Sequence, residues 1–428
     1  MIIHVVQPGQ TLNSIANQYN VTPQRLITDN ALPNPDNLLV GQSIVVLYTD
    51  VTHTVVEGDT LYDIAETYGV QVTQILRNNP WLADTQGLTP GETIVISFQR
   101  DEVLGNITIN GYAYPFIDRT VLRKTLPFLT YFSLFTYGFT PEGDLIPIDD
   151  TELIQISRDY SVAPIMMLAP MDSEGDFSNE IAHQMFLNPE GQAKLIDNIL
   201  TNIQTKNYSG IDLDFEFVLP EDKQSFIDFI AAVKAKLEPE GYIVMVPLAP
   251  KTSGEQAGLL YEAHDYPAIG AIADKVLLMT YEWGYTFGPP MATAPLDSVR
   301  RVLEYGISVI DPNKILMGIP NYAYDWILPF VRGESEAESL SNVEALERAI
   351  NYNASIQFDE AAQVPFYYYT SEDGKVHVVW FEDARSMNAK FRLIPEYGLN
   401  GAGIWQIMNY FPQGWTVINN LFDITKVL

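Results

Sequence analysis

Three acidic residues alternate with large apolar residues in one short segment. Asp212, Asp214 and Glu216 stand two residues apart, and Ile, Leu and Phe occupy the neighbouring positions. On a β-strand, side chains two residues apart share a face, so the three carboxyls point one way and the apolar side chains the other. Crowding and burial raise carboxyl pKa values, which leaves an acid protonated near neutral pH. The spacing therefore predicts a general acid, and Glu216 is the candidate nearest the carboxyl end of the strand.

Two structural roles would also explain this alternation: a strand at the solvated edge of a sheet, or a cation site. A solvated strand does not need large apolar residues between its acids, and neither His nor Asn joins the row as a further ligand. Catalysis is therefore the favoured interpretation. It requires elements that bury the apolar face and leave the acids at the end of a strand.

Residues 98–428 alternate between short apolar segments and helical stretches, which predicts an α/β fold with a parallel sheet and helices outside it. The number of segments fits a (β/α)₈ TIM barrel, whose active sites lie at the carboxyl ends of the strands. A small α+β insertion is expected within 327–400, before the last strand. We expect the barrel to have a core of its own, independent of residues 1–97. The expected barrel strands are 107–113, 129–134, 163–169, 210–215, 243–247, 275–279, 314–318 and 403–407.

The segment from Ser209 to Glu216 resembles the catalytic strand of glycoside hydrolase family 18, which contains chitinases and related N-acetylglucosaminidases. Other segments similar to that family follow in order. Met279-Thr280-Tyr281 ends the expected sixth strand, Gly318-Ile319-Pro320-Asn321-Tyr322 ends the seventh, and Gly403-Ile404-Trp405 lies on the eighth. The resemblance spans residues 103–427 and includes the insertion.

The resemblance implies a role for each residue of the site. Glu216 would donate a proton to the glycosidic oxygen, and the substrate's own 2-acetamido oxygen would attack the anomeric carbon with net retention. Asp214 would hold the acetamido N–H, and Asp212 would tune Asp214 from below. Tyr281 would donate to the acetamido oxygen, and Trp405 would form the floor under the −1 sugar. Weaker candidates for sugar contacts, with packing as the alternative, are Tyr322, Tyr324, Asp325 and Trp283.

Two positions depart from the family pattern. Ser209 stands where the family usually has Asp, and it is expected to alter a proton relay through Asp212. Glu282 stands where an Asp usually follows the tyrosine of the sixth strand, and it is expected to change which sugars the −1 site accepts. Neither change removes a residue that the mechanism requires.

The N-terminal part contains an internal repeat. His4–Leu12 recurs as His53–Leu61 at an offset of 49 residues, and similar helical and closing segments follow in both copies. Each copy is expected to fold as strand, helix, helix, strand. The pair resembles two LysM modules, at residues 2–47 and 51–97, which implies binding of N-acetylglucosamine-containing glycans such as peptidoglycan or chitin.

In that family the ligand lies between the turn after the first strand and the loop before the last strand. The matching residues are Gly9, Gln10, Thr11, Leu12 and Asn30 in the first copy, and Gly58, Asp59, Thr60, Leu61 and Asn79 in the second. The alternative for the Thr and Leu residues is that they only cap and pack the first helix of each module.

Composition limits the classes of partner. The chain of 428 residues carries 24 Lys and Arg against 54 Asp and Glu, which gives a formal net charge of −30. Such a surface repels polyanions, so we expect that nucleic acid is not a partner. We also expect that any glycan is bound through neutral sugar groups. Cysteine is absent from the sequence, which excludes disulfides and thiolate metal sites, and we expect neither a metal nor a cofactor. The sequence contains no apolar run of about 18 residues, so it predicts no membrane span. The segment Met1–Val6 does not resemble a signal peptide.

The resemblances together predict a retaining glycosidase that cleaves β-1,4 bonds after N-acetylglucosamine in peptidoglycan. The whole chain resembles the spore cortex-lytic N-acetylglucosaminidases, which implies a location at the spore cortex or coat, with the cell wall or extracellular space as the alternative. A chitinase stays open, because chitin also presents N-acetylglucosamine in β-1,4 linkage. A non-catalytic glycan-binding spore protein is the alternative from another class. A muramidase would need room for a lactyl-bearing sugar. The sequence does not predict the oligomeric state.

Overall fold

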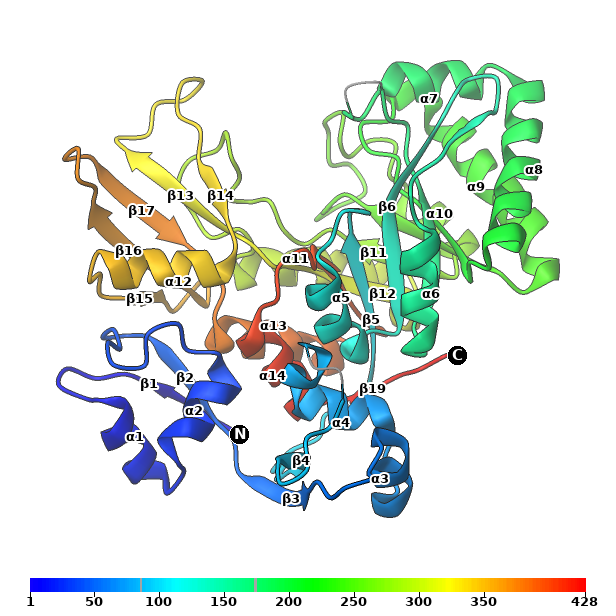
Figure 1. Cartoon of the computed structure of the whole chain (residues 1–428). Coiled ribbons are helices and arrows are strands. Elements are labelled where there is room, and N and C mark those ends of the chain that lie inside the picture. The colour runs from blue at the N-terminus through cyan, green and yellow to red at the C-terminus, as the bar shows by residue number, and fades with distance from the viewer. Residues whose placement is uncertain (85–86, 173–174) are drawn as a thin grey trace.

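The structure is a computed structural model that describes residues 1–84, 87–172 and 175–428. Two small modules at the N-terminus lie beneath a large barrel, and a further sheet is inserted late in the barrel sequence (Figure 1). In the part of the chain that the structure describes, no helix is both long and apolar enough to cross a bilayer.

Each N-terminal module folds as strand, helix, helix, strand, with its two strands antiparallel. The first helix begins where a threonine side chain caps it: Thr11 accepts from the Ser14 N–H and Thr60 from the Asp63 N–H, at 3.2 and 3.1 Å. The elements of module 1 are β1 (Ile2–Val5), α1 (Leu12–Tyr19), α2 (Pro23–Asn30) and β2 (Ser43–Val46). Those of module 2 are β3 (Thr49–Thr54), α3 (Leu61–Tyr68), α4 (Val72–Asn78), the 3₁₀ helix η1 (Pro80–Asp84) and β4 (Thr93–Phe98).

Among the described residues, eight parallel strands close into a barrel in the order β5, β6, β8, β9, β10, β11, β12, β18 and back to β5. Every strand overlaps a segment expected from the sequence, and β6 continues to Phe139, past the expected end at Leu134. The TIM-barrel prediction is therefore confirmed. The strands are β5 (Asn106–Ala113), β6 (Tyr131–Phe139), β8 (Ala163–Leu168), β9 (Gly210–Leu213), β10 (Ile243–Leu248), β11 (Lys275–Leu278), β12 (Ile315–Pro320) and β18 (Gly401–Trp405).

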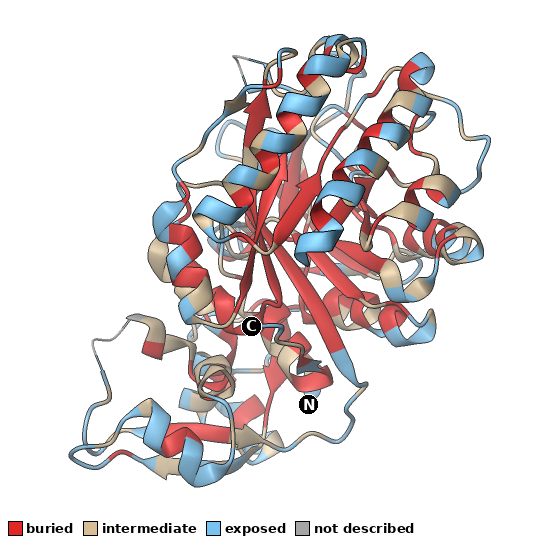
Figure 2. Ribbon diagram, turned by 90° about the vertical axis from the view of Figure 1, so that its right-hand side faces the viewer, coloured by how far each residue is buried: buried red, intermediate tan, exposed pale blue. Residues whose placement is uncertain are grey.

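Helices surround the barrel and cover the outer face of its strands, and the inner face is filled by side chains of the strands themselves. Figure 2 shows buried strands inside a ring of helices whose outer faces are exposed, as expected for a parallel sheet with near-continuous apolar strands. The helices are α5 (Arg119–Thr125), η2 (Leu126–Phe128), α6 (Thr151–Asp159), α7 (Asn179–Phe186), α8 (Pro189–Lys206), η3 (Pro220–Asp222), α9 (Lys223–Leu237), η4 (Glu238–Glu240), α10 (Tyr266–Ile272), α11 (Leu296–Val309), η5 (Pro312–Lys314), α13 (Ala384–Glu396) and α14 (Pro412–Leu421). Two short strands, β7 (Leu145–Ile146) and β19 (Asp423–Ile424), extend the sheet.

A second sheet is inserted between β12 and β18, and α12 (Asn342–Asn351) packs on it (Figure 1). Of the described strands, five form this antiparallel sheet, in the order β14, β13, β17, β16, β15. The insertion therefore begins at Ala323, before the expected start at residue 327. The strands are β13 (Ala323–Leu328), β14 (Glu338–Leu340), β15 (Gln357–Asp359), β16 (Val364–Thr370) and β17 (Val376–Trp380).

The modules share buried surface with the barrel. Val45 and Leu47, from the closing strand of module 1 and its end, belong to the same buried apolar cluster as the barrel strands. Leu39 of module 1 is buried in the core of the insertion. Side chains of module 1 therefore add to the cores of both neighbours, and the expectation that the barrel core is sufficient on its own stays a prediction.

Candidate active site

Strand β9 carries the three acids to the end of the barrel. Asp212 is fully buried and Asp214 is 4% exposed, whereas Glu216 is partly exposed on the turn beyond the last paired residue. The Asp214 N–H donates to Leu168 O at 3.0 Å, which continues the parallel pairing with β8. On the opposite face, the ring of Phe215 stacks on Phe226 with centroids 5.3 Å apart. The alternation expected from the sequence thus places carboxyls inside the barrel and apolar rings against its helices.

The deepest carboxyl is held by hydroxyl groups. The Tyr112 and Ser133 hydroxyls donate to Asp212 Oδ2 at 2.9 and 3.2 Å. Ser209, in contrast, lies partly exposed at the amino end of β9, and the bonds found for it are made by its backbone, to Pro164 and Ile243. The expected effect of Ser209 on a relay through Asp212 therefore has no support in the geometry.

Two buried carboxylate oxygens stand without a protein partner. Within the described residues, no hydrogen-bond partner is found for Oδ1 of Asp212 or Oδ1 of Asp214. An unpaired buried oxygen costs free energy, so such an atom carries a proton or receives a donor from water or a ligand. Asp214 lines the cleft, which makes it accessible to a ligand N–H.

Burial controls the protonation of these acids. Burial, together with the negative charge of Glu282, raises the pKa of Glu216 to about 7. Burial also raises the pKa of Asp214 well above its usual range, with added repulsion from Glu216 and Asp212. For Asp212, burial raises the pKa to about 6 against the opposing hydrogen bonds of its two partners. The site therefore retains protons near neutral pH, as a general acid requires.

A cleft of about 570 Å³ opens over the acids. Tyr281 enters it from the residues just after β11, and burial together with the charges of Asp214 and Glu216 raises its pKa, so the phenol stays available as a donor. Trp405, at the end of β18, is held at its edges by the rings of Tyr114 and Phe135, whose centroids lie 6.1 and 5.2 Å away.

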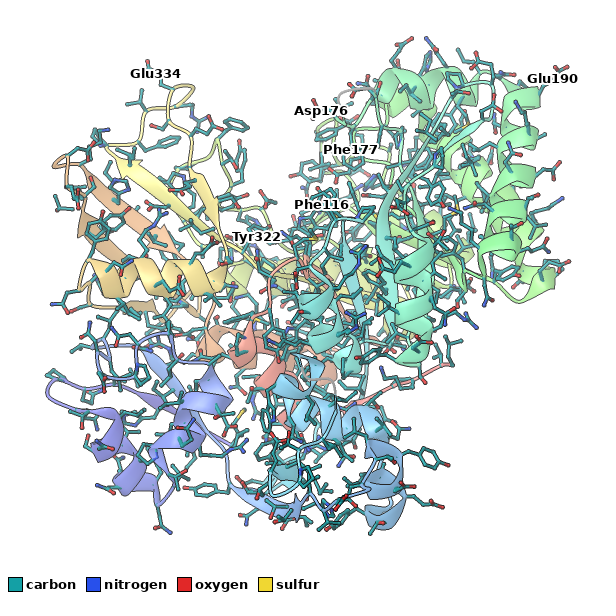
Figure 3. The ribbon with its side chains drawn as sticks, viewed as in Figure 1. Phe116, Asp176, Phe177, Glu190, Tyr322 and Glu334 are labelled. Atoms are coloured by element: carbon teal, nitrogen blue, oxygen red, sulfur yellow. The ribbon has the colours of Figure 1, made fainter. Side chains whose placement is uncertain are left out.

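The described residues that line the cleft come from the barrel strands and the loops after them, and Asp176 and Phe177 are among them. Figure 3 shows Phe116, Asp176 and Phe177 on the barrel side, and Tyr322 on the side of the insertion. Sequence reasoning missed Tyr112, Tyr114 and Phe135, although the alternation of tyrosines along β5 is visible in the sequence. These aromatic residues make the wall into which Trp405 packs.

The weaker candidates for sugar contacts lie at different places in the structure, and not all of them reach the cleft. The hydroxyls of Tyr322 and Tyr324 both donate to Glu282, the second at 3.2 Å, so they reach the cleft through that carboxylate. Asp325 is buried inside the insertion, where it accepts from Arg348, from the Tyr369 hydroxyl at 2.6 Å and from His377 Nδ1 at 2.8 Å. Its oxygens hold the insertion together. Trp283 packs against the barrel core and is not found among the described residues that line the cleft.

The turns that the sequence predicts to bind glycan combine exposed and structural residues. Gly9, Thr11, Gly58 and Thr60 are exposed. Leu12 is buried in the core of module 1 and Leu61 is partly buried in that of module 2, which gives these leucines a packing role.

The second residue of each turn folds back onto its own module. Gln10 Oε1 lies 2.8 Å from both the Gln7 N–H and His4 Nε2. Asp59 Oδ2 repeats the arrangement with the Val56 N–H at 2.7 Å and His53 Nε2 at 2.9 Å. These bonds fix the shape of the turn that presents the capping threonine.

Two asparagines assigned to the glycan surface are buried. Asn79 donates to Ile75 O and Val95 O at 2.8 and 2.7 Å and accepts from the Val95 N–H at 2.8 Å. Asn30 makes the same three bonds to Leu26 and Val45. The structure therefore corrects their assignment: each amide ties the second helix to the closing strand and does not face solvent.

Among the described residues, no group of three or more His, Cys, Asp or Glu side chains is placed to hold an ion.

Comparisons with known proteins cover every part of the chain. The model of the glycosyl hydrolases family 18 matches residues 171–409, and the LysM domain model matches 4–46 and 53–97. The cortical fragment-lytic enzyme of Bacillus subtilis (strain 168) is 36% identical over 428 residues, which are 100% of this chain and 99% of that protein. The crystal structure of the Bacillus megaterium QM B1551 spore cortex-lytic enzyme SleL matches with a TM-score of 0.83 and 38% identity, over 100% of this chain and 99% of that one. The corresponding Bacillus cereus structure matches with a TM-score of 0.83 and 36% identity, over 99% of both chains. The similarity thus extends over modules, barrel and insertion.

Proposed function

Because the chain belongs to glycosyl hydrolases family 18 and carries two LysM domains, we propose that it is a retaining N-acetylglucosaminidase that cleaves β-1,4 bonds in spore cortex fragments. The observation that carries the proposal is the unpaired, buried Oδ1 of Asp214 beside the raised-pKa acid Glu216, in a cleft over which Tyr281 and Trp405 lie. The full-length similarity to enzymes named for spore cortex lysis supports the substrate.

In this mechanism Glu216 holds a proton in the free enzyme and gives it to the glycosidic oxygen. The 2-acetamido oxygen of the substrate attacks the anomeric carbon as the bond from that carbon to the protonated glycosidic oxygen breaks. The +1 part of the glycan leaves as an alcohol, and the sugar at −1 becomes a cyclic oxazolinium-like intermediate. The Asp214 carboxyl accepts the acetamido N–H, and in its ionised form it offsets the positive charge that develops on the ring. Glu216 then takes a proton from water, which opens the intermediate with net retention.

Tyr281 orients the acetamide directly, and Asp212 acts on it only through Asp214. The Tyr281 phenol donates to the acetamido oxygen and aligns it for attack. Asp212 is too deep to touch the sugar and lies directly below Asp214, whose pKa its charge raises. The protein therefore needs only one carboxyl as acid and base, and the substrate supplies the nucleophile.

The substrate requirement follows from this chemistry. The sugar at −1 must carry a free acetamide, which N-acetylglucosamine has and muramic δ-lactam lacks. N-acetylmuramic acid keeps the acetamide, but its lactyl group would crowd the floor formed by Asp214, Tyr281 and Trp405. N-acetylglucosamine is therefore the sugar at −1, and muramic sugars occupy +1.

The two modules bind the same class of glycan through the exposed turns around Thr11 and Thr60. A net charge of −30 disfavours polyanionic partners, so recognition relies on neutral sugar groups. The location that this function requires is the spore, at the cortex or coat.

The direct test replaces the acid. Glu216→Gln removes the transferable proton and preserves the shape of the side chain, so turnover of unactivated cortex fragments should fall by about 10²- to 10⁴-fold. The matched control is Glu334→Gln, at an exposed position at the tip of the insertion (Figure 3), which should keep the parent rate. Equal rates for the two variants would remove Glu216 from the mechanism.

A further inference from the structure

The backbone that carries Glu216 leaves the barrel sheet just before the acid. The Asp214 N–H makes the last bond to the neighbouring strand, to Leu168 O at 3.0 Å. Among the described residues, no backbone-to-backbone hydrogen bond is found at Phe215 or Glu216. Phe217 then adopts a φ of +56°, in the left-handed region that residues with a side chain rarely occupy, so the chain turns away directly after the acid.

The carboxyl of Glu216 is not held by a neighbouring side chain. In the part of the chain that the structure describes, no hydrogen-bond partner is found for it, and the charges that act on it repel it. The direction in which the acid points therefore depends on the backbone beneath it. That backbone needs an anchor from outside the sheet.

His264 provides this anchor. Its Nδ1 accepts the Ala249 N–H at 2.7 Å, directly after β10. A backbone N–H only donates, so Nδ1 carries no proton and the ring hydrogen lies on Nε2. Nε2 therefore donates to Phe215 O, which lies 3.0 Å away. One imidazole thus links the end of β10 to the turn after β9.

His264 is itself held from several sides. Its side chain is buried, and its ring lies against Phe226 with centroids 6.1 Å apart. Lys251 Nζ donates to His264 O at 3.1 Å. The Tyr266 hydroxyl donates to Ala249 O at 2.6 Å and accepts the Lys251 N–H at 3.0 Å. The anchor is therefore fixed at its base and can transmit that position to Phe215.

The ring stays neutral where the acid works. Burial, together with the charge of Lys251, lowers the pKa of His264 to about 4, against the opposing hydrogen bond to Phe215 O. A protonated ring would turn an N–H toward the Ala249 N–H, which would break the link to β10. Both bonds of the imidazole therefore persist near neutral pH.

The bonded carbonyl belongs to the peptide group that joins Phe215 to Glu216. The atoms of a peptide group lie in one plane that ends at the Cα atom of the following residue, here Glu216. The ring of Phe215 is stacked on Phe226, so the near end of that plane is held by packing. The bond from His264 fixes its rotation, which sets the direction in which the Glu216 side chain leaves the backbone.

We propose that His264 is a positioning residue for the acid: by holding Phe215 O it aims the Glu216 carboxyl at the glycosidic oxygen. It does not line the cleft and acts only through Glu216, so this inference rests on the proposed role of that residue. The alternative is that His264 only fills the core between two loops.

The test uses two replacements that each keep one of the two bonds. In His264→Gln, the side-chain NH₂ reaches the place of Nε2 and still donates to Phe215 O. In His264→Asn, Oδ1 takes the place of Nδ1 and still accepts the Ala249 N–H, but the side chain is too short to reach Phe215. Each variant loses one buried hydrogen bond and part of the ring's packing, so the two should have similar thermal unfolding temperatures.

The measurement compares two leaving groups. A nitrophenyl glycoside of an N-acetylglucosamine oligomer departs with little help from an acid, whereas a sugar leaving group in cortex fragments needs the proton. Values of kcat/KM, which report steps up to departure of the leaving group, are taken per folded site, counted with a thiazoline analogue of N-acetylglucosamine. His264→Asn should lose about 10- to 100-fold on cortex fragments and no more than about threefold on the nitrophenyl glycoside. His264→Gln should stay within about threefold of the parent on both substrates.

A second variant and a double variant make the test independent of one replacement. Tyr266→Phe removes the hydroxyl beneath the anchor and should show the same bias toward loss on cortex fragments, at smaller size. Adding His264→Asn to Glu216→Gln should cost less than about threefold more, because a residue that acts through the acid has nothing left to position.

Equal losses on the two substrates in both His264→Asn and Tyr266→Phe would overturn the inference, because a general loss of structure affects both substrates alike. A loss in His264→Gln as large as in His264→Asn would also overturn it, since the bond to Phe215 would then not matter. Failure of the proposed function gives a different result: Glu216→Gln alone would keep the parent rate.

Discussion

Glu282 connects Glu216, the proposed acid, to the residues at the start of the insertion. Its side chain accepts the hydroxyls of Tyr322 and Tyr324 from the start of the inserted sheet, and its charge raises the pKa of Glu216. Burial raises the pKa of Glu282 itself, and the two tyrosine donors oppose that shift and favour its charged form. The departure from the family pattern at this position therefore bears on the protonation of the acid as well as on the sugar that fits.

The charge of Glu282 makes a pH prediction. Glu216 acts as an acid only while protonated, so activity falls as pH rises through its pKa of about 7. Glu282→Gln removes a neighbouring negative charge, which lowers the Glu216 pKa and moves the alkaline limb of kcat/KM to lower pH by roughly one unit. The full pH profile of this variant is compared with that of Glu334→Gln. A limb that stays in place would show that Glu282 does not act on the acid.

At the scale of the element, the sequence predicted most of what positions the site. The period of two around Asp214 fixed which face of β9 enters the barrel, because side chains alternate strictly along a strand. The sequence could not predict that Asp325 is buried inside the insertion. A polar residue beside a family motif gives no sign that Arg348, from α12, and His377, from β17, enclose it. The wall around Trp405 was missed for the same reason: it is assembled from separate strands.

Within each N-terminal module, the sequence located the turns but could not assign a role to every residue. The pattern located both turns, yet it could not distinguish Asn79 as a glycan ligand from Asn79 as a buried tie, since both roles require an asparagine after the second helix. Asn79 makes the same hydrogen bonds to its module as Asn30 makes to the other one, and this equivalence supports the structural role.

A stability measurement tests that role. Asn79→Ala leaves the Val95 N–H and C=O without their partner inside module 2, so the free energy of unfolding should fall by about 2–4 kcal/mol. Denaturant unfolding followed together with hydrogen exchange at β4 would locate the loss. Asn34→Ala, at an exposed loop position of module 1, should stay near the parent value. Wild-type stability combined with weakened glycan binding would return Asn79 to the ligand surface.

At the scale of the whole molecule, the arrangement of the parts was beyond sequence reasoning. Residues such as Val45, Gln413 and Arg77 look ordinary in the sequence, because their partners lie hundreds of positions away. The structure joins two modules, barrel and insertion through such contacts. The modules therefore stand at a fixed place relative to the cleft.

The central claim is that the bond broken follows N-acetylglucosamine, and the sugar at the new reducing end tests it most directly. Cortex fragments digested with the full chain are reduced with borohydride and analysed by mass spectrometry, with chitin oligomers digested alongside. Substrate assistance through Asp214 and Tyr281 requires a free acetamide at −1, so reduced products should end in N-acetylglucosaminitol. Recovery of mainly reduced muramic species would contradict this account, because those sugars would then have occupied the site that the acetamide mechanism reserves for N-acetylglucosamine.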